Sequence, residues 1–224
     1  MTPHGRSESS LRVLIVDDHS MLADAVRLSL EAHGTDGSAI DVTVAVDLSH
    51  DGVLETARAE SPDVILLDLD LGESDRNVDL VAPLTRAGHR VVMFTGWSGA
   101  RLLGEAIEAG AAGILRKSDT FERLLDGIRD AAAGRTVTRP SERDAIVAEA
   151  RRLRETEQTR EDRLSSLTPR ERHVLACLVE GCTAEEIAVG ETISLTTVRT
   201  HIKAILRKLD VSSQLAAVAL AHSG

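Results

Sequence analysis

Aromatic side chains are nearly absent from this sequence, which has one tryptophan, two phenylalanines and no tyrosine in 224 residues. Aliphatic side chains must therefore fill any core, and the 42% hydrophobic content is enough to form one. No apolar run approaches the roughly 18 residues that a membrane span needs. The first ten residues also lack the apolar centre of a signal peptide. These absences argue against a membrane or secreted protein and predict a cytoplasmic one.

Cysteine is scarce as well. Cys177 and Cys182 are the only two, and their spacing matches no metal or redox motif. A fold based on disulfides is thereby excluded. The two residues are expected to act as small buried hydrophobes in a reducing compartment.

A basic excess is also missing, since the formal net charge is −10. The imbalance is confined to residues 11–134, which contain 22 acidic and 11 basic residues. The rest of the chain is close to neutral. An acidic first half followed by neutral segments predicts two domains with different partners.

Short apolar runs alternate with helical patterns through residues 11–134. The clearest run is Val64 to Leu67, continuous and apolar, which is how a strand buried on both faces of a parallel sheet reads. Similar strands are expected at 11–16, 42–46, 91–94 and 113–116, each followed by a helix that a glycine or polar turn ends. Five strand–helix repeats predict an α/β domain with a doubly wound (βα)5 sheet.

Four of these five strands lead into residues that can carry chemistry. The first ends in Asp17-Asp18, the third in Asp68, the fourth in Thr95 and the fifth in Lys117. All would lie at the carboxyl edge of one parallel sheet, where α/β proteins place their sites. Crowded carboxylates repel one another unless a cation lies among them, and their hard oxygens suit Mg²⁺. Asp68 is therefore expected to attack a phosphoryl group beside Mg²⁺, with Thr95 and Lys117 holding the phosphoryl oxygens.

Residues 11–134 resemble the receiver domain of bacterial response regulators, a flavodoxin-like fold. The motifs that carry the resemblance are Val16-Asp17-Asp18-His19, Leu66-Leu67-Asp68, Phe94-Thr95-Gly96 and Leu115-Arg116-Lys117. The resemblance implies that Asp68 accepts a phosphoryl group from a sensor histidine kinase. It also implies that Asp18 binds Mg²⁺ directly, Asp17 through water and Asp70 through its carbonyl. Thr95 and Lys117 would then read the phosphorylated state.

Three departures from the family pattern concern the signal relay. The loop 69–77 has no proline and extra acidic residues where the family usually has Met-Pro and a glycine. Ser118 follows Lys117 where the family often has proline, as happens in the branch of the family with DNA-binding output. Ile114 occupies the position of the family's switch aromatic, so a ring cannot turn inward behind Thr95 in the usual way. Trp97, two residues after Thr95, is either a packing residue or a substitute for that ring.

Residues 135–166 are polar and charged and are expected to form a helical linker that begins after Pro140. Apolar residues fall at helical spacing here, but Glu157 and Arg160 interrupt the stripe. A short dimeric coiled coil is the alternative to a solvated helix, although the stripe is short for one.

Residues 167–224 contain the signals of four helices. Thr168 and Thr183 each stand three residues before a glutamate, the pattern of a capping box, and Ser194 can cap a longer third helix. A short helix, a turn and a longer helix form the helix-turn-helix pattern. The longer helix, 195–209, carries four cations and no acidic residue, which suits entry into a DNA major groove.

This segment resembles the LuxR-type helix-turn-helix domain. The motifs are Leu167-Thr168-Pro169-Arg170-Glu171-Arg172, Glu186-Ile187-Ala188, Thr197-Val198-Arg199-Thr200-His201 and Leu206-Arg207-Lys208-Leu209. The resemblance implies base contacts from Arg199, Thr200 and Lys203, and phosphate contacts from Thr197, Arg207 and Lys208. Thr183, by its capping position, could place the amino end of a helix near a phosphate. The resemblance also implies a homodimer, formed through the last helix, on double-stranded promoter DNA. RNA polymerase is a further candidate partner, and no membrane is expected to be one.

The sequence therefore predicts a DNA-binding response regulator with a receiver at 11–134, a helical linker at 135–166 and a LuxR-type domain at 167–224. Phosphorylation of Asp68 would control dimerisation and promoter binding. A regulator that binds DNA without phosphorylation, its receiver used for dimerisation or ligand sensing, stays open. The order Asp68, Thr95, Lys117 also resembles haloacid-dehalogenase-type phosphatases, but those carry an acid pair after the lysine, and here no acid pair in the context of a strand follows Lys117. We therefore expect no enzyme.

Overall fold

The computed structural model describes residues 10–33, 39–69, 77–96 and 99–222. The chain forms two compact units, Met1–Arg152 and Leu153–Gly224, and each is described by itself. Two residues singled out by the sequence, Asp70 and Trp97, lie outside the described residues.

A parallel sheet of five strands, in the order β2-β1-β3-β4-β5, forms the centre of the first unit. The strands are β1 (Leu11–Val16), β2 (Ile40–Val44), β3 (Val64–Leu67), β4 (Arg90–Thr95) and β5 (Gly113–Arg116). The helices that follow them are α1 (Ser20–Ala32), α2 (His50–Glu60), α3 (Val78–Arg86), α4 (Ala100–Glu108) and α5 (Phe121–Ala132). The predicted doubly wound (βα)5 fold is thereby confirmed.

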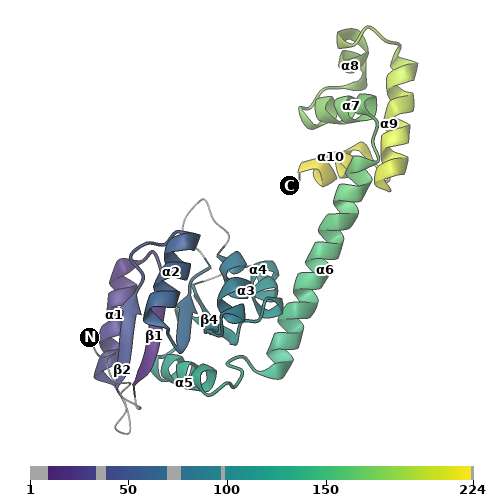
Figure 1. Cartoon of the computed structure of the whole chain (residues 1–224). Helices are drawn as coiled ribbons and strands as arrows, with labels where there is room; N and C mark the ends of the chain where they lie inside the picture. The colour runs from purple at the N-terminus through teal and green to yellow at the C-terminus, as the bar shows by residue number, and fades with distance from the viewer. Residues whose placement is uncertain (1–9, 34–38, 70–76, 97–98, 223–224) are drawn as a thin grey trace. The chain divides into compact units, whose positions relative to one another are not determined.

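Helices cover both faces of this sheet (Figure 1). Side chains of α2, α3 and α4 pack on the face that carries Leu14, Ile65 and Met93. Those of α1 and α5 pack on the opposite face, which carries Ile15 and Leu66. Because β3 lies in the middle of the sheet, its four apolar residues are fully buried, as the continuous apolar run predicted.

The second strand differs from its prediction at both ends. It was expected at 42–46, but β2 runs from Ile40 to Val44, and Val46 is 97% exposed. The reason is pairing: β2 is an edge strand that follows β1 from the Leu11–Ile40 pair onward, and the register, not the local hydrophobicity, sets where it ends. The first helix has no side-chain cap, since Ser20 is the first residue of α1 and His19 before it makes no capping hydrogen bond.

One long helix, α6 (Pro140–Ser165), forms most of the segment predicted as a linker. The boundary between the two units falls inside this helix, after Arg152, rather than at its ends. Ala150 in its first half is fully buried, and Leu164 in its second half packs against the core of the second unit. Arg160 donates a hydrogen bond to the carbonyl of Leu220 at 2.7 Å. The segment is helical as predicted, but the interpretation as a solvated linker missed these contacts.

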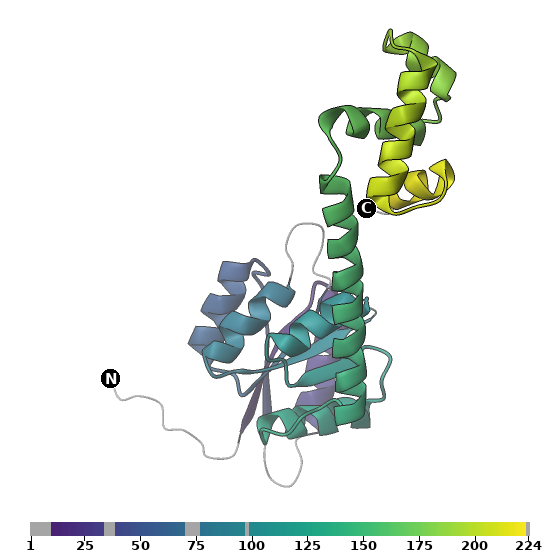
Figure 2. The same ribbon diagram turned by 90° about the vertical axis from the view of Figure 1, so that its right-hand side faces the viewer.

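Four further helices make up the rest of the second unit (Figure 2). They are α7 (Pro169–Val179), α8 (Ala184–Gly190), α9 (Leu195–Leu209) and α10 (Gln214–His222). Both predicted capping boxes are present, Thr168 with Glu171 and Thr183 with Glu186, and the Ser194 side chain accepts a hydrogen bond from the N–H of Thr197. These caps fix where three of the helices begin. The aliphatic core between them is built on Val174, Ile187, Val198 and Ile205 among others.

None of the described helices is both long and apolar enough to cross a membrane. The longest, α6, is highly charged along its length.

Candidate functional site

Strand pairing brings the predicted site residues of the first unit to one edge of the sheet. Val16 pairs with Leu67, so Asp17 and Asp68, the next residue on each strand, start side by side. The N–H of Asp68 donates to the carbonyl of Val16 at 2.9 Å. In the same way the N–H of Lys117 donates to the carbonyl of Thr95 at 2.9 Å, which joins the ends of β4 and β5. The backbone therefore brings the ends of these strands together, as expected from the sequence.

The side chain of Lys117 connects two of the acids. Its Nζ lies 2.8 Å from Oδ2 of Asp17 and 2.7 Å from Oδ2 of Asp68, and both aspartates are almost fully buried. Burial alone would lower the pKa of Lys117, but hydrogen bonds to Asp17 and Asp68 and their negative charges outweigh it and raise that pKa. The ammonium therefore stays charged and compensates the carboxylates.

The second acid of the pair, Asp18, is more exposed and contacts a neighbour instead. Nδ1 of His19 lies 2.7 Å from Oδ1 of Asp18, and the N–H of His19 donates to Oδ1 of Asp17 at 2.9 Å. Sequence reasoning gave His19 no place among the ligands. The structure nevertheless places its ring nitrogen in the same cluster as oxygens of Asp17, Asp18 and Asp68, all within 4.8 Å of one another.

The donor set of this cluster fits a divalent cation. Three carboxylates against the single ammonium of Lys117 leave an excess of negative charge at the edge of the sheet. Carboxylate oxygens are the ligands that Mg²⁺ prefers, usually together with several waters. The acidic cluster at the position predicted for the metal is thus present, while Asp70, the predicted carbonyl ligand, lies outside the described residues.

A buried asparagine that the sequence interpretation overlooked supports the backbone of Asp68. Nδ2 of Asn77 donates to the carbonyl oxygen of Asp68 at 3.1 Å, and Asn77 is 1% exposed. Asn77 precedes α3, so sequence reasoning would take it for a helix cap, yet it makes no capping hydrogen bond. Only its distance of nine residues from Asp68, across the loop, could have suggested the contact.

The face of the sheet behind this site carries Thr95, Met93 and Ile114. Thr95 is buried at the end of β4, and Met93 pairs in register with Ile114 on β5. Since side chains alternate between faces along a strand, Thr95 and Met93 lie on one face, and Ile114 packs on that face too. The position of the missing switch aromatic is thus filled by a half-buried aliphatic side chain.

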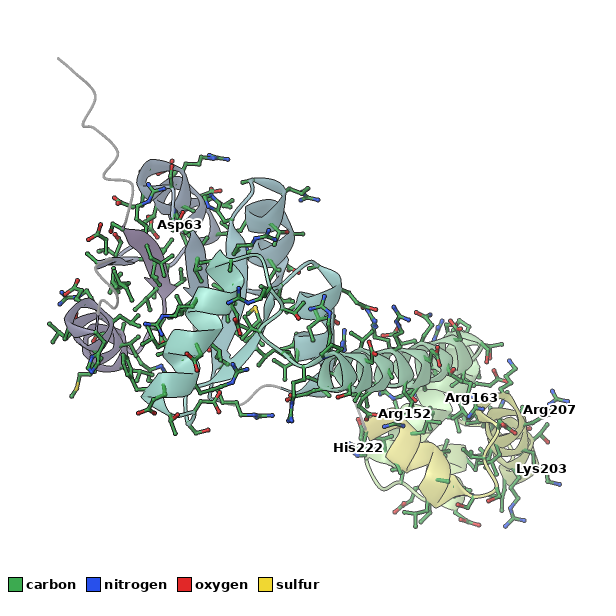
Figure 3. The ribbon with its side chains drawn as sticks, turned by 90° about the horizontal axis from the view of Figure 1, so that it is seen from below. Asp63, Arg152, Arg163, Lys203, Arg207 and His222 are labelled. Carbon is green, nitrogen blue, oxygen red and sulfur yellow. The ribbon has the colours of Figure 1, made fainter. Side chains whose placement is uncertain are left out.

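In the second unit, one side of α9 is cationic and the other is apolar. Arg199, Lys203 and Arg207 are exposed and stand four residues apart, so they lie along one face of the helix. Lys203 and Arg207 point away from the unit (Figure 3). The opposite side of α9, with Val198 and Ile205 among its residues, is buried in the core. This is the arrangement that the sequence predicted for a groove-binding helix.

The threonines that were predicted to contact DNA are exposed, but their polar groups already have hydrogen-bond partners within the unit. Thr200 is exposed, with its hydroxyl bonded to the carbonyl of Thr196 at 2.9 Å. Thr197 is exposed at the start of α9, and its hydroxyl lies 2.8 Å from that of Ser194. Thr183 is exposed, but the carboxylate of Glu186 already accepts from its N–H at 2.7 Å. A phosphate at the start of α8 would have to compete with that carboxylate.

Lys208, unlike Lys203 and Arg207 as far as the described residues show, is held by close partners inside the unit. Its Nζ donates to Oε2 of Glu171 at 2.6 Å and to the carbonyl of Ser166 at 3.1 Å. Glu171 is buried, and its pKa is lowered first by the hydrogen bond from Lys208 and then by those from Thr168. Lys208 thus ties α9 to the start of α7, a use that the motif resemblance did not indicate. Arg199 has a weaker partner, since its Nη2 lies 3.4 Å from Glu185 and both side chains are exposed.

Comparison with known families matches both units. The family model of the response regulator receiver domain matches residues 13–129, and that of bacterial regulatory proteins of the luxR family matches residues 165–221. The chain therefore belongs to the response regulators that carry a LuxR-type DNA-binding domain, a family of transcription regulators rather than enzymes.

Individual relatives share both halves of the chain. The nitrate/nitrite response regulator protein NarP of Escherichia coli (strain K12) is 36% identical over 220 residues, which cover 93% of each chain. The transcriptional regulatory protein LiaR of Bacillus subtilis (strain 168) is 32% identical over 222 residues, 95% of this chain and 97% of LiaR. The crystal structure of a LuxR-family two-component response regulator from Aurantimonas sp. SI85-9A1 is 25% identical, with a TM-score of 0.52 over 64% of this chain and 99% of that one.

Proposed function

We propose that Asp68 is the phosphoryl acceptor of this regulator and that its phosphorylation controls promoter binding. The observation that carries the proposal is the pair of contacts made by Lys117, which place one ammonium against both Asp17 and Asp68 at the edge of the sheet. A buried carboxylate held beside a second acid and a lysine can act as a nucleophile once a cation compensates its charge.

The transfer would proceed from a phosphohistidine of a sensor histidine kinase. A carboxylate oxygen of Asp68 attacks phosphorus, the bond from phosphorus to the imidazole nitrogen breaks, and that nitrogen keeps the electron pair. Asp17, Asp18 and Asp68 would hold Mg²⁺, with the carbonyl of Asp70 as a further ligand. When bound, the ion supplies positive charge that compensates the phosphoryl oxygens. Lys117 would exchange its carboxylate partners for a phosphoryl oxygen.

The output half would bind double-stranded promoter DNA through α9. Arg199, Thr200 and Lys203 would reach base edges, while Arg207 and Thr197 would contact phosphates. Thr183 is kept as a weaker phosphate contact because Glu186 occupies the start of α8. Lys208 is left out of the interface because Glu171 and Ser166 already bind its ammonium. A homodimer on a two-fold site and contact with RNA polymerase belong to the same proposal.

The acceptor is tested by incubating the full chain with acetyl phosphate and Mg²⁺ and measuring its intact mass. We expect an increase by one phosphoryl group, placed on Asp68 by borohydride trapping and peptide mapping. Asp68→Asn should show no increase, and Asp63→Asn, an exposed aspartate on the same stretch of chain, should behave as the natural sequence does. Incorporation that persists in Asp68→Asn would refute the assignment.

Ile114 favours a second candidate function, a regulator that binds DNA without phosphorylation. With an aliphatic residue where the ring stands in the family, the chain could bind DNA equally well in either state of Asp68. That regulator would still take up phosphoryl groups in the mass experiment, so the two functions are separated only by DNA binding.

A further inference from the structure

The two cysteines of the chain meet at the turn between α7 and α8. The N–H of Cys182 donates to the carbonyl of Cys177 at 2.9 Å, and the N–H of Gly181 donates to that of Leu178 at 3.1 Å. With Gly181 at a φ of 89°, these two bonds form a Schellman motif, which ends α7. Side chains of the first and last residues of this motif frequently pack together. The motif therefore places Cys177 and Cys182 side by side.

Both cysteines are half-buried rather than buried, which differs from the expectation of two small core residues. They are free thiols, and their side chains pack against the core of the second unit while part of each stays open to solvent. The hydrogen bond between their backbones is compatible with the Cα separation of roughly 4.4–6.8 Å that a disulfide requires. Rotation of the two side chains can then bring the sulfurs together.

The two thiols also adjoin both ends of α8. Sγ of Cys177 lies 3.8 Å from Nε2 of His173, and the same nitrogen lies 2.6 Å from Oε1 of Glu191. Glu191 is the C-cap of α8. Thr183, the residue directly after Cys182, is the N-cap of the same helix. A change in the position of the sulfurs therefore acts on the start of α8 through the chain and on its end through His173.

The helix between these ends supports the cationic helix α9. Ile187 of α8 and Val198 of α9 are buried in one core cluster, and both cysteines pack against that cluster. On the surface, Nη2 of Arg199 on α9 lies 3.4 Å from Glu185 on α8. A shift of α8 is therefore expected to displace the cationic face of α9.

We propose that Cys177 and Cys182 form a reversible disulfide, and that this disulfide gives the DNA-binding half a response to peroxides that is separate from the chemistry of Asp68. The thiolate of one cysteine attacks the O–O bond of a hydroperoxide and becomes a sulfenic acid, while the leaving oxygen takes a proton. The thiolate of the other cysteine attacks that sulfur, the S–O bond breaks, and hydroxide leaves with the electron pair. The two sulfurs thus lose the two electrons that the peroxide gains. A thiol reductant reverses the bond by exchange.

The surroundings of Cys177 make this reaction slow. Burial raises the pKa of Cys177, and the neighbouring charge of Cys182 raises it further. Two acids, Glu180 and Glu191, add to this effect. Because the thiolate is the reactive form, oxidation requires an excess of peroxide. The pair therefore responds to sustained oxidation, and a reducing compartment keeps it open at other times.

The bond is tested by treating the full chain with hydrogen peroxide and a metal chelator, which prevents metal ions from masking the thiols. Remaining thiols are then blocked with N-ethylmaleimide. Mass is measured on the intact chain and on the tryptic peptide 173–199, which contains both cysteines. We expect a monomer whose peptide has lost two hydrogen atoms and carries no maleimide, and dithiothreitol should restore two reactive thiols.

Cys177→Ser and Cys182→Ser are the matched controls for this product. Each leaves a single thiol, so neither should lose two hydrogen atoms within one chain. If a serine variant does not fold, Cys177→Ala or Cys182→Ala replaces it. In the natural sequence, two thiols that still react with maleimide after peroxide would overturn the assignment. A covalent dimer in place of the oxidised monomer would overturn it as well.

The response is tested by the DNA affinity of the reduced and the oxidised chain. We expect oxidation to weaken DNA binding by about fivefold or more, the lower end of the usual coupling between sites, because it displaces groups at both ends of α8. Dithiothreitol should restore the affinity. The two serine variants should bind DNA as the reduced natural chain does, before and after peroxide. A disulfide that forms completely and leaves the affinity unchanged would refute the response.

Asp68→Asn separates this inference from the proposed function. Its DNA affinity should fall on oxidation by the same factor as that of the natural chain. If peroxide alters DNA binding in the natural chain but not in Asp68→Asn, the response is not separate and the inference is refuted. Failure of Asp68 to take up a phosphoryl group would end the proposed function and leave the disulfide and its effect on DNA binding in place.

Discussion

Two lysines in this protein look alike in the sequence and differ in what surrounds them. Lys117 lies between Asp17 and Asp68 at an edge of the sheet where negative charge remains in excess. Lys208 lies against Glu171, whose other hydrogen bonds close a helix cap. The first ammonium lies in a cluster where negative charge remains in excess, which is why we propose that a cation and a phosphoryl group bind there. The second ammonium lies in a contact whose charges are already paired. The role proposed for Lys117 therefore depends on the negative charge that its partners leave uncompensated.

The largest expected effect comes from removing the first of these ammoniums. Lys117→Met leaves two buried carboxylates side by side, and we expect a loss of about 3 kcal/mol in the free energy of unfolding in metal-free buffer. Mg²⁺ should restore much of this loss, since an ion that binds only the folded state stabilises it. Urea unfolding with and without Mg²⁺ measures both.

Lys208→Met is the counterpart in the second unit. We expect a loss of about 2 kcal/mol that Mg²⁺ does not restore, because the contact is a hydrogen-bonded charge pair with no cation site. Equal rescue of the two variants by Mg²⁺ would contradict the distinction between them.

Next in size is the effect of the exposed cations of α9 on DNA binding. Arg207→Ala should weaken binding to all sequences alike and reduce the slope of log affinity against log salt by about one. Arg172→Ala, which removes an exposed cation on α7, should leave the slope unchanged. The free energy of unfolding should stay within about 0.5 kcal/mol for both. A slope unchanged by Arg207→Ala would remove this residue from the interface.

The smallest effect concerns the pH dependence of the Glu171 contact. Its pKa is lowered in the folded chain, chiefly by the hydrogen bond from Lys208, so its stabilisation is complete above the unfolded pKa of about 4.3. It is lost as pH falls through that value and then through the lower folded pKa. Glu171→Gln should cost about 1 kcal/mol at pH 7 and flatten the acid side of the stability curve. An unaltered acid side would show that the pair contributes nothing.

Local patterns predicted most of the fold because each element has its cause within a few residues. The capping boxes at Thr168 and Thr183 and the buried run of β3 are of this kind. The meeting of Asp68 with Lys117 was also predictable, since parallel strands end at a common edge. These features need only periodicity and topology.

The contacts that the sequence did not predict join residues far apart in the chain. The residue types that make them are common ones with no special signal in the sequence. Gly104 and Ala150 are ordinary helix residues in the sequence, yet a side-chain carbon added at Gly104 would lie 2.2 Å from Cβ of Ala150. The contact of Asn77 with Asp68 was not predicted because Asn77 stands at a position typical of a helix cap. The contact of Lys208 with Glu171 was not predicted because Lys208 belongs to a DNA-binding motif. The roles of these residues depend on burial and on tertiary partners, and the periodicity of the sequence carries no information about either.

The most direct test of the switch is a DNA-binding titration of the full chain with Mg²⁺, with and without beryllofluoride, repeated on Asp68→Asn. We expect beryllofluoride to raise the DNA affinity of the natural sequence by about tenfold and to leave that of Asp68→Asn unchanged. Equal affinity under every condition would contradict control of DNA binding by Asp68. The chain would then be a regulator whose DNA binding does not depend on the state of that residue.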